Sequence, residues 1–175
     1  MSTYQQELNK AMLLLAAQPN AIFVGQSVVY GGQAMFSSFE GIPNEQRIEF
    51  PVAEDLQMGF CTGLALGGFL PVSVYPRMDF LLLAFNQLVN HLDKFSQLAG
   101  IKPKVIIRTA VGAKKPMYAG PQHSQDHTDA LREMTTNDVE VYTLPYKEAI
   151  VPMYQQALKH DGSLVIVEYA ELYNT

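Results

Sequence analysis

The segment PVAEDLQMG (residues 51–59) is the most informative stretch of this chain, because it places two carboxylates where an apparent loop becomes a helix. The helix then continues as an almost entirely apolar, Gly- and Ala-rich run over residues 60–68. A charge at the mouth of a buried element is costly unless another group satisfies it. Two interpretations of Glu54 are therefore open. An acid in the first turn of a helix is favoured by the helix dipole, and a carboxylate at this place can instead hydrogen-bond a ligand.

Apolar runs and amphipathic segments alternate on both sides of this stretch, and no hairpin signature separates them. The patterns predict strands over residues 21–24, 47–50, 71–75, 104–108, 139–142 and 164–167. They predict helices over 3–17, 54–68, 80–98, 128–134 and 146–159, with irregular connections over 31–44 and 110–126. Strands that alternate with helices indicate an α/β fold, with a doubly wound, mainly parallel sheet and helices on both faces. We expect one domain over residues 1–175, a length that suits a single buried core.

Sheets of this kind bind ligands beyond the carboxyl ends of their strands. The loops expected at that edge are 25–33, 51–54, 76–80, 109–127 and 143–146. Glu54, Phe80 and His123 all fall in these loops. This shared edge favours a ligand contact over simple capping for Glu54.

Phe80 and His123 each have a simpler interpretation as well. His123 lies in the polar stretch QHSQ (residues 122–125), where a histidine can move protons near neutral pH or can merely be solvated. Phe80 precedes three leucines (residues 81–83), so it could belong to the core or offer an aromatic face to a flat ligand.

Composition and motifs exclude several other classes of protein. The net charge is -5, with Lys and Arg scattered along the chain, so we expect no nucleic-acid partner. No signal peptide or membrane-length apolar run is present, so we expect a cytoplasmic protein without a membrane partner. Cys61 is the only cysteine and is expected to be a small buried hydrophobe. His123 and His127 lack further ligand-rich motifs nearby, so we expect no metal site, and no phosphate-binding glycine motif occurs.

Several short motifs occur in an order that resembles a known family. They are PVAE (51–54) before the Gly- and Ala-rich helix, PV (71–72), DF (79–80), FNQLVN (85–90), VIIR (105–108), QHSQ (122–125), and Glu168 with Tyr173. From about residue 20 to the C-terminus, the chain resembles the pyrimidine-binding, transketolase-like domain of thiamine-diphosphate enzymes. The similarity is greatest to the beta subunit of 2-oxoacid dehydrogenase E1 components, and the transketolases are more distant.

The resemblance implies a role for each candidate residue. Glu54 would hydrogen-bond the N1′ atom of the aminopyrimidine of thiamine diphosphate, a contact strong enough in a dry pocket to activate the cofactor. Phe80 would pack on the pyrimidine ring, and His123 would handle protons or negative charge on the substrate. The cofactor would then serve as an electron sink for decarboxylation or carbon–carbon cleavage of a 2-oxoacid or ketose-like substrate. Asp55 would be left as the capping acid of the helix.

The chain also departs from the family pattern. The family usually has an acidic pair where this chain has Gln26 and Ser27, and Arg77 and Met78 occupy places that are often aromatic or small. Neither the C-terminal domain of the beta subunits nor the Gly-Asp-Gly…Asn motif that holds Mg²⁺ and diphosphate is present. We therefore expect a separate E1 alpha-like subunit to hold Mg²⁺ and the diphosphate, and we expect self-association. Two alternatives remain: a non-catalytic binding or regulatory module derived from this domain, and an independent small-molecule-binding α/β protein.

Overall fold

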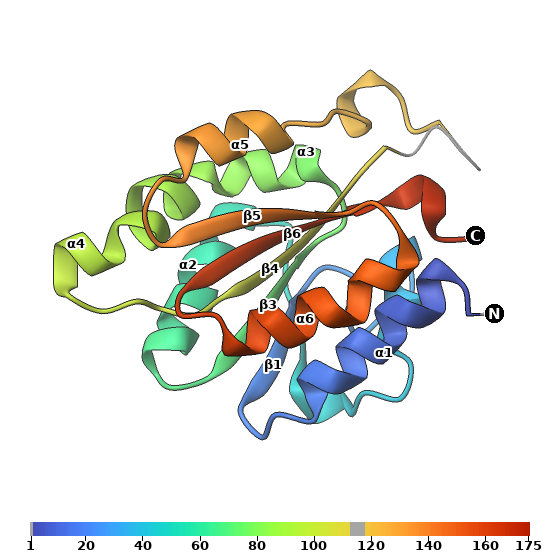
Figure 1. Cartoon of the computed structure of the whole chain (residues 1–175), viewed down its shortest axis with the longest axis horizontal. Coiled ribbons are helices and arrows are strands. Elements are labelled where there is room, and N and C mark those ends of the chain that lie inside the picture. Colours follow the sequence, from blue (N-terminus) through green and yellow to red (C-terminus); the bar gives the residue numbers. More distant parts are fainter. Residues whose placement is uncertain (1, 113–117) are drawn as a thin grey trace.

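The computed structural model describes residues 2–112 and 118–175, and a parallel sheet runs through the centre of this part of the chain (Figure 1). Its six strands are β1 (Ala21–Gly25), β2 (Arg47–Glu49), β3 (Leu70–Tyr75), β4 (Ile106–Val111), β5 (Val139–Leu144) and β6 (Ser163–Tyr169). All five neighbouring pairs are parallel. The predicted strands are therefore confirmed, with β4 shifted toward the C-terminus by two to three residues relative to the expected 104–108.

The strand order is β2-β1-β3-β4-β6-β5, so the chain adds strands on opposite sides of β1. The chain leaves β1 for β2 on one side and returns to β3 on the other, so the topological switch point lies between β1 and β3. β1 ends at Gly25. A larger residue would not fit at this position, because its Cβ would lie 2.4 Å from the carbonyl oxygen of Val74 in β3. The predicted doubly wound α/β fold is confirmed.

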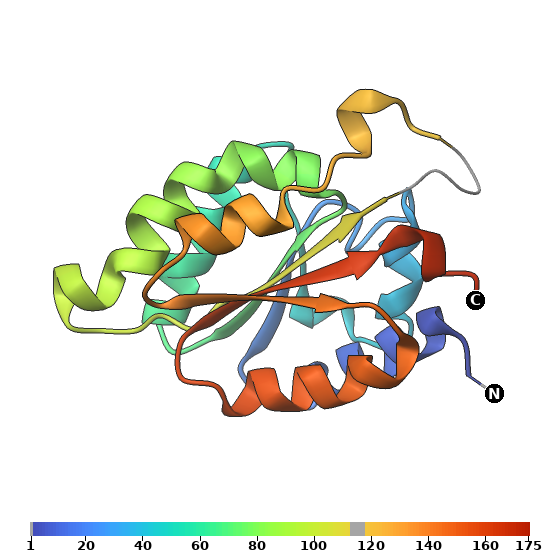
Figure 2. The same ribbon diagram turned by 45° about the horizontal axis from the view of Figure 1, so that its top comes forward.

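Helices cover both faces of the sheet, as Figure 2 shows. One face carries α1 (Tyr4–Ala16) and α6 (Ile150–Lys159), which pack against each other. The other carries α2 (Glu54–Leu66), the segment from α3 (Met78–Leu81) to α4 (Phe95–Ala99), and α5 (Thr128–Met134). Short 3₁₀ turns complete the chain: η1 (Ala34–Phe39), η2 (Asn44–Gln46), η3 (Leu82–Ala84), η5 (Leu92–Lys94), η6 (Pro121–His123), η7 (Lys147–Ala149) and η8 (Ala170–Leu172).

Two hydrophobic cores result, one on each face of the sheet. Adjacent strand residues alternate between them: Ile106 packs in the core under α1 and α6, and Ile107 packs in the core under α2 and α3. This alternation is the two-residue period of a strand whose faces are both covered, and it explains why the strand sequences are apolar throughout.

The predicted continuous helix over residues 80–98 is wrong in detail. The segment begins at Met78, and its middle is a π-helix, η4 (Asn86–His91), flanked by η3 and η5. A π turn holds more residues than an α turn. The wider turn therefore brings Asp93, five residues beyond Leu88, to the buried side of the segment, and both side chains are fully buried.

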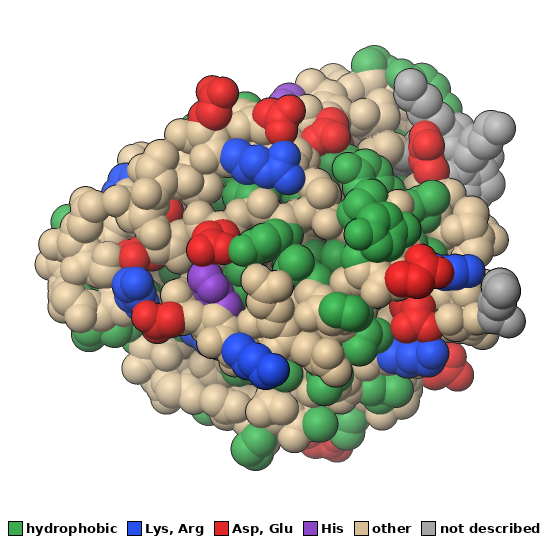
Figure 3. All heavy atoms as spheres, viewed as in Figure 1, with side chains coloured by type: hydrophobic (Ala, Val, Ile, Leu, Met, Phe, Trp, Pro, Cys, Tyr) green, Lys and Arg blue, Asp and Glu red, His purple; other side chains and the backbone are tan. Residues whose placement is uncertain are grey.

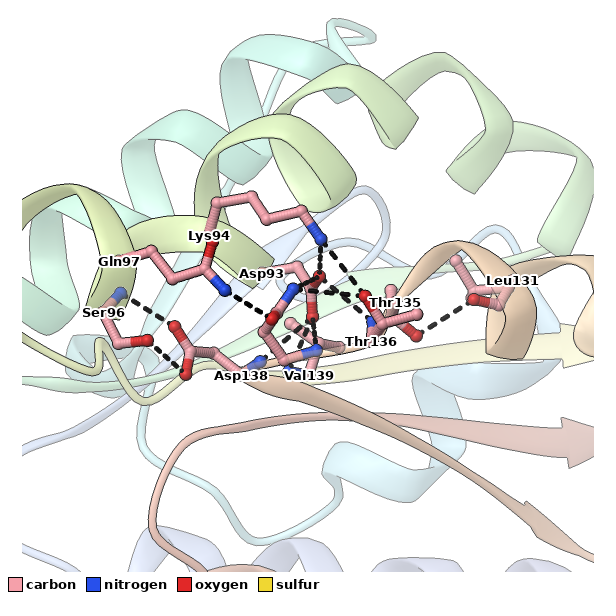
Figure 4. A network of polar contacts seen from close by, with 10 residues as sticks. Asp93, Lys94, Ser96, Gln97, Leu131, Thr135, Thr136, Asp138 and Val139 are labelled. Atoms are coloured by element: carbon pink, nitrogen blue, oxygen red, sulfur yellow. Dashed lines mark hydrogen bonds and ion pairs between the residues drawn. The ribbon is translucent and has the colours of Figure 1, made fainter.

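Asp93 anchors the connection between α5 and β5 (Figure 4). Its carboxylate accepts backbone N–H bonds from Thr136, Asn137, Asp138 and Val139, at 3.1–3.2 Å, and a bond from the Lys94 ammonium at 2.7 Å. Burial alone would raise the pKa of Asp93, but these donors outweigh it and hold the pKa below its ordinary value. The connection between α5 and β5 is thus held in place by one side chain, that of Asp93 in η5.

A second buried charge joins the centre of the sheet to the helices of one face. The Arg108 guanidinium in β4 donates to the Glu168 carboxylate in β6 at 2.6 and 3.0 Å, and both side chains are fully buried. Ser38 accepts from Arg108, while the hydroxyls of Tyr154 and Tyr173 donate to Glu168. Burial alone would lower the pKa of Arg108, but the Glu168 charge and hydrogen bonds raise it above its ordinary value. Arg108 therefore stays charged and paired.

The surface carries charges of both signs. On the side of the molecule seen in Figure 3, Lys and Arg are interspersed with Asp and Glu rather than gathered in a stripe. In residues 2–112 and 118–175, none of the helices has the length and apolar character needed to cross a membrane.

Replacing Asp93 with alanine is expected to lower the free energy of unfolding by about 3 kcal/mol, because several buried N–H donors lose their acceptor at once. Urea unfolding followed by circular dichroism measures the change. Asp129→Ala is the matched control: Asp129 forms an exposed i,i+3 pair with Arg132, which contributes little. Equal midpoints for the two variants would contradict the anchoring role of Asp93.

The depressed pKa of Asp93 also predicts a pH dependence of stability. A carboxyl whose folded pKa is lowered contributes stability above its unfolded pKa, and this contribution is lost as the pH falls through the folded value. Below pH 3.8, the ordinary aspartate pKa, the wild-type chain should therefore lose more stability than Asp93→Asn. Denaturant titrations of both proteins across this range make the comparison, and parallel curves would rule the effect out.

Candidate functional site at the carboxyl edge of the sheet

A cavity of about 520 Å³ opens at the carboxyl ends of the central strands. Its lining includes Gln26 after β1, Arg77 and Phe80 after β3, Ala110 at the end of β4 and Tyr173 after β6. The cavity thus spans the switch point between β1 and β3, where doubly wound folds bind ligands. Its volume falls in the range of small-molecule sites.

Glu54 lies beside this cavity as the first residue of α2 and is only 4% exposed. Its Oε1 atom accepts a hydrogen bond of 3.1 Å from Nε2 of Gln26, which lines the cavity. Ala53 occupies the N-cap position, where no side chain of the described residues forms a capping bond, and Glu54 is the first acid of the first turn. Asp55 lies in the first turn of α2, as expected of the capping acid; it is exposed and accepts from Nε2 of Gln87 at 3.3 Å.

Two buried hydrogen-bonding groups position the start of α2 against the sheet. The Gln57 amide donates to the carbonyl oxygens of Val24 and Val74 at 3.3 and 3.1 Å, which bridges β1 and β3. The Tyr75 hydroxyl donates to the carbonyl oxygen of Glu54 at 3.3 Å. The orientation of Glu54 is therefore set by a rigid frame rather than by a loop.

Glu49, at the end of β2, holds the turn that follows β1. Its carboxylate accepts backbone N–H bonds from Ser27, Val28 and Val29, at 2.6–3.0 Å, and a longer one from Tyr30 at 3.5 Å. Ser27 has a φ of +56°, a conformation that costs energy for a residue with a side chain. Glu49 stabilises this turn and, with it, the position of Gln26 next to Glu54.

Phe80 lines the cavity after β3, and His123 packs against Phe80 just outside the lining. Their ring centroids are 5.4 Å apart, and both side chains are half-buried. Nη1 of Arg77 donates to the carbonyl oxygen of His123 at 2.8 Å and fixes the η6 turn. The Nδ1 atom of His123 is buried and has no hydrogen-bond partner among the described residues. A histidine held in this way can exchange a proton with a bound molecule.

The three residues predicted from the sequence are thus brought to one edge, though not into mutual contact. Phe80 touches His123, and Glu54 is linked to the cavity through Gln26, while neither Glu54 nor His123 is part of the lining itself. Gln26 and Glu49 were missed as parts of the site. The position of Glu49 at the end of a strand on the ligand edge was a usable signal, whereas nothing local indicated the pairing of Gln26 with Glu54.

No metal centre emerges from the part of the chain that the structure describes, where no three His, Cys, Asp or Glu side chains gather as ligands. Cys61 is buried in α2, as expected, and burial raises the pKa of its thiol to about 12. The thiol therefore stays protonated and is no nucleophile.

Comparisons with known proteins agree with this architecture. The chain is 26% identical over 161 residues to the pyruvate dehydrogenase E1 component subunit beta of Chaetosphaeridium globosum, covering 89% of this chain and 48% of the relative. It is 25% identical over 173 residues to the acetoin:2,6-dichlorophenolindophenol oxidoreductase subunit beta of Cupriavidus necator, covering 91% and 50%. The 3-methyl-2-oxobutanoate dehydrogenase subunit beta of Mycobacterium tuberculosis is 28% identical over 133 residues, covering 73% and 37%. No protein-family model matches the chain.

A solved structure described as a split gene transketolase, an inactive beta4 tetramer, has the same fold. The TM-score is 0.70 at 18% identity, over 95% of this chain and 50% of the other. The chain spans about half the length, or less, of the relatives it matches. The resemblance predicted from the sequence is confirmed: the chain is similar to part of an E1 beta subunit and has a transketolase-like fold.

Replacing Glu49 with glutamine should loosen the turn after β1, because an amide has one acceptor oxygen and its NH₂ group faces the same backbone donors. Amide hydrogen exchange at Val28 and Val29 is expected to accelerate by about tenfold or more, since bonds to a charged acceptor each contribute about 1.5–3 kcal/mol. Glu45→Gln, at an exposed position just before β2, is the control and should leave both rates unchanged. Unchanged exchange in Glu49→Gln would show that the turn holds without the charge.

Proposed function

We propose that this chain is the pyrimidine-binding subunit of a two-chain thiamine-diphosphate-dependent enzyme that acts on a 2-oxoacid or ketose-like substrate. The observation that carries the proposal is the Glu54 carboxylate, which is buried at the carboxyl edge of the sheet with the Gln26 amide as its hydrogen-bond donor. A buried carboxylate normally has several donors, because desolvation is costly. A ligand with a ring nitrogen would supply the further bond.

The residues at this edge fit the aminopyrimidine of thiamine diphosphate. Glu54 offers the acceptor, Phe80 offers a half-buried aromatic face, and His123 offers a ring nitrogen to which no described residue forms a hydrogen bond. Thiamine diphosphate, when bound, supplies an electron sink for cleavage of a bond next to a carbonyl. In this arrangement Glu54 orients the pyrimidine and stabilises the tautomer that accepts a proton, and Phe80 excludes water from the ring. His123 transfers a proton to or from the substrate.

The same proposal requires a second, E1 alpha-like chain to hold Mg²⁺ and the diphosphate. A surface next to Glu54 suits such a partner: Val52 is 79% exposed, Leu56 61% and Leu83 62%, with Phe60 39% exposed on the next turn of α2. α2, which carries Leu56 and Phe60, packs beside η3, which carries Leu83, and Val52 lies just before α2. Apolar side chains that gather beside a site are typical of an interface. The inactive beta4 tetramer of the split transketolase further supports self-association and a need for a partner.

The isolated chain should therefore show no measurable affinity for thiamine diphosphate and Mg²⁺, and affinity should appear when the diphosphate-binding chain is added. Isothermal titration calorimetry with and without the co-expressed partner measures this difference. Tight binding of the cofactor by the isolated chain would contradict the two-chain arrangement.

Replacing Glu54 with glutamine should lower kcat by about 100-fold or more, the usual effect of removing one preorganised electrostatic contact. Asp55→Asn is the matched control, because it removes the neighbouring exposed carboxylate of the same helical turn. A capping role for Glu54 predicts reduced stability with near-normal kcat, which would refute the proposed chemistry. Cofactor binding without turnover in the wild-type complex would instead indicate a binding or regulatory module.

A further inference from the structure

The cavity at the carboxyl edge contains one charge that the proposed function does not use. Arg77 is the only charged side chain among the described residues that line it, and the remaining polar lining comes from Gln26, Ser27, Gln33 and Tyr173. Arg77 is the residue before α3 and lies between Pro76 and Phe80 at the switch point. The cavity therefore has a positive wall next to an aromatic one.

The guanidinium of Arg77 is only partly satisfied by the protein. Nη1 donates to the carbonyl oxygen of His123, and a guanidinium carries five N–H donors. In residues 2–112 and 118–175, no carboxylate forms an ion pair with Arg77. Three other acids lie at this edge: Glu54 accepts from Gln26, Asp79 accepts from the Gln125 amide at 2.9 Å, and the Glu171 side chain lies next to Gly112 of the lining.

An unpaired, half-buried guanidinium in a cavity selects for a negatively charged group. Arginine binds carboxylate and phosphate through two parallel N–H bonds, and the strength of such bonds grows as water is excluded. The bond from Nη1 to His123 fixes the guanidinium plane in advance, which reduces the entropy lost when an anion binds. A purely structural role would need only that one bond.

We propose that Arg77 forms an anion subsite in this cavity, where it binds a carboxylate or phosphate group of a small organic ligand. The volume of about 520 Å³ admits such a ligand together with its anionic group. The ligand is a substrate only if the proposed function holds, since that identification rests on it. Arg77 then determines specificity: it favours substrates whose anionic group reaches the part of the cavity wall formed by Pro76, Arg77 and Phe80.

The anion subsite is tested on the full chain alone, without cofactor or partner, so its failure is distinguishable from failure of the proposed function. Sodium phosphate, sodium acetate and neutral acetamide are titrated at constant ionic strength while ¹⁵N NMR follows the Nε–Hε signal of Arg77 and the amides of Ala110 and Gly112. We expect saturable shifts with phosphate, acetate or both, and none with acetamide. Phosphate binding alone would indicate a phosphate ester, and acetate binding alone would indicate a carboxylate.

Two substitutions and one control complete the test. Arg77→Gln should weaken anion binding by at least about tenfold, and Arg77→Lys should retain part of it, because the charge remains while the forked geometry is lost. If Arg77→Gln does not fold, Arg77→Lys still reports the loss of the fork. Arg132→Gln, which removes an exposed arginine paired with Asp129, should leave the titration unchanged. Identical saturation in Arg77→Gln and wild type, or no saturation with either anion, would overturn the proposal.

Discussion

The buried ion pair between Arg108 and Glu168 connects more of the molecule than any other polar contact described above. It joins the neighbouring strands β4 and β6. Ser38 of η1, Tyr154 of α6 and Tyr173 near the C-terminus form the further hydrogen bonds of the pair. Removing one partner of such a pair leaves an uncompensated charge in a dry interior, which is far more costly than the pair is stabilising. The helices of one face must therefore keep their positions relative to the sheet.

This constraint reaches the cavity through Tyr173. Its hydroxyl donates to Glu168 at 2.6 Å, while its side chain forms part of the cavity lining. Burial and the neighbouring Glu168 charge raise the pKa of Tyr173 well above its ordinary value, so the hydroxyl remains a donor throughout the physiological range. Tyr173 thus attaches the cavity to the buried ion pair of the core, while Phe80, another residue of the lining, follows β3 and packs against His123 of η6.

Much of the fold could be predicted from local patterns, because strands covered on both faces have apolar sequences and the helices between them are amphipathic. The π-helix at 86–91 could not be predicted in this way. Its segment still has a helical hydrophobic pattern, and the wider turn changes only which side of the helix the following residues face. For the site, the loops expected at the carboxyl ends of the strands predicted Glu54, Phe80 and His123 at one edge, and the sheet topology brings them there; their roles came from the resemblance alone. The bonds of Gln26 with Glu54 and of Arg108 with Glu168 join residues 28 and 60 positions apart, and no local pattern encodes such pairings.

The turn after β1 has one further consequence. In doubly wound proteins the first strand-to-helix turn commonly presents consecutive backbone N–H groups to a phosphate. Here those groups, from Ser27 to Tyr30, already surround the carboxylate of Glu49. The chain thus carries its own internal anion among the N–H groups of this turn. A phosphate could enter this turn only by displacing a covalently tethered competitor, whose effective concentration never falls.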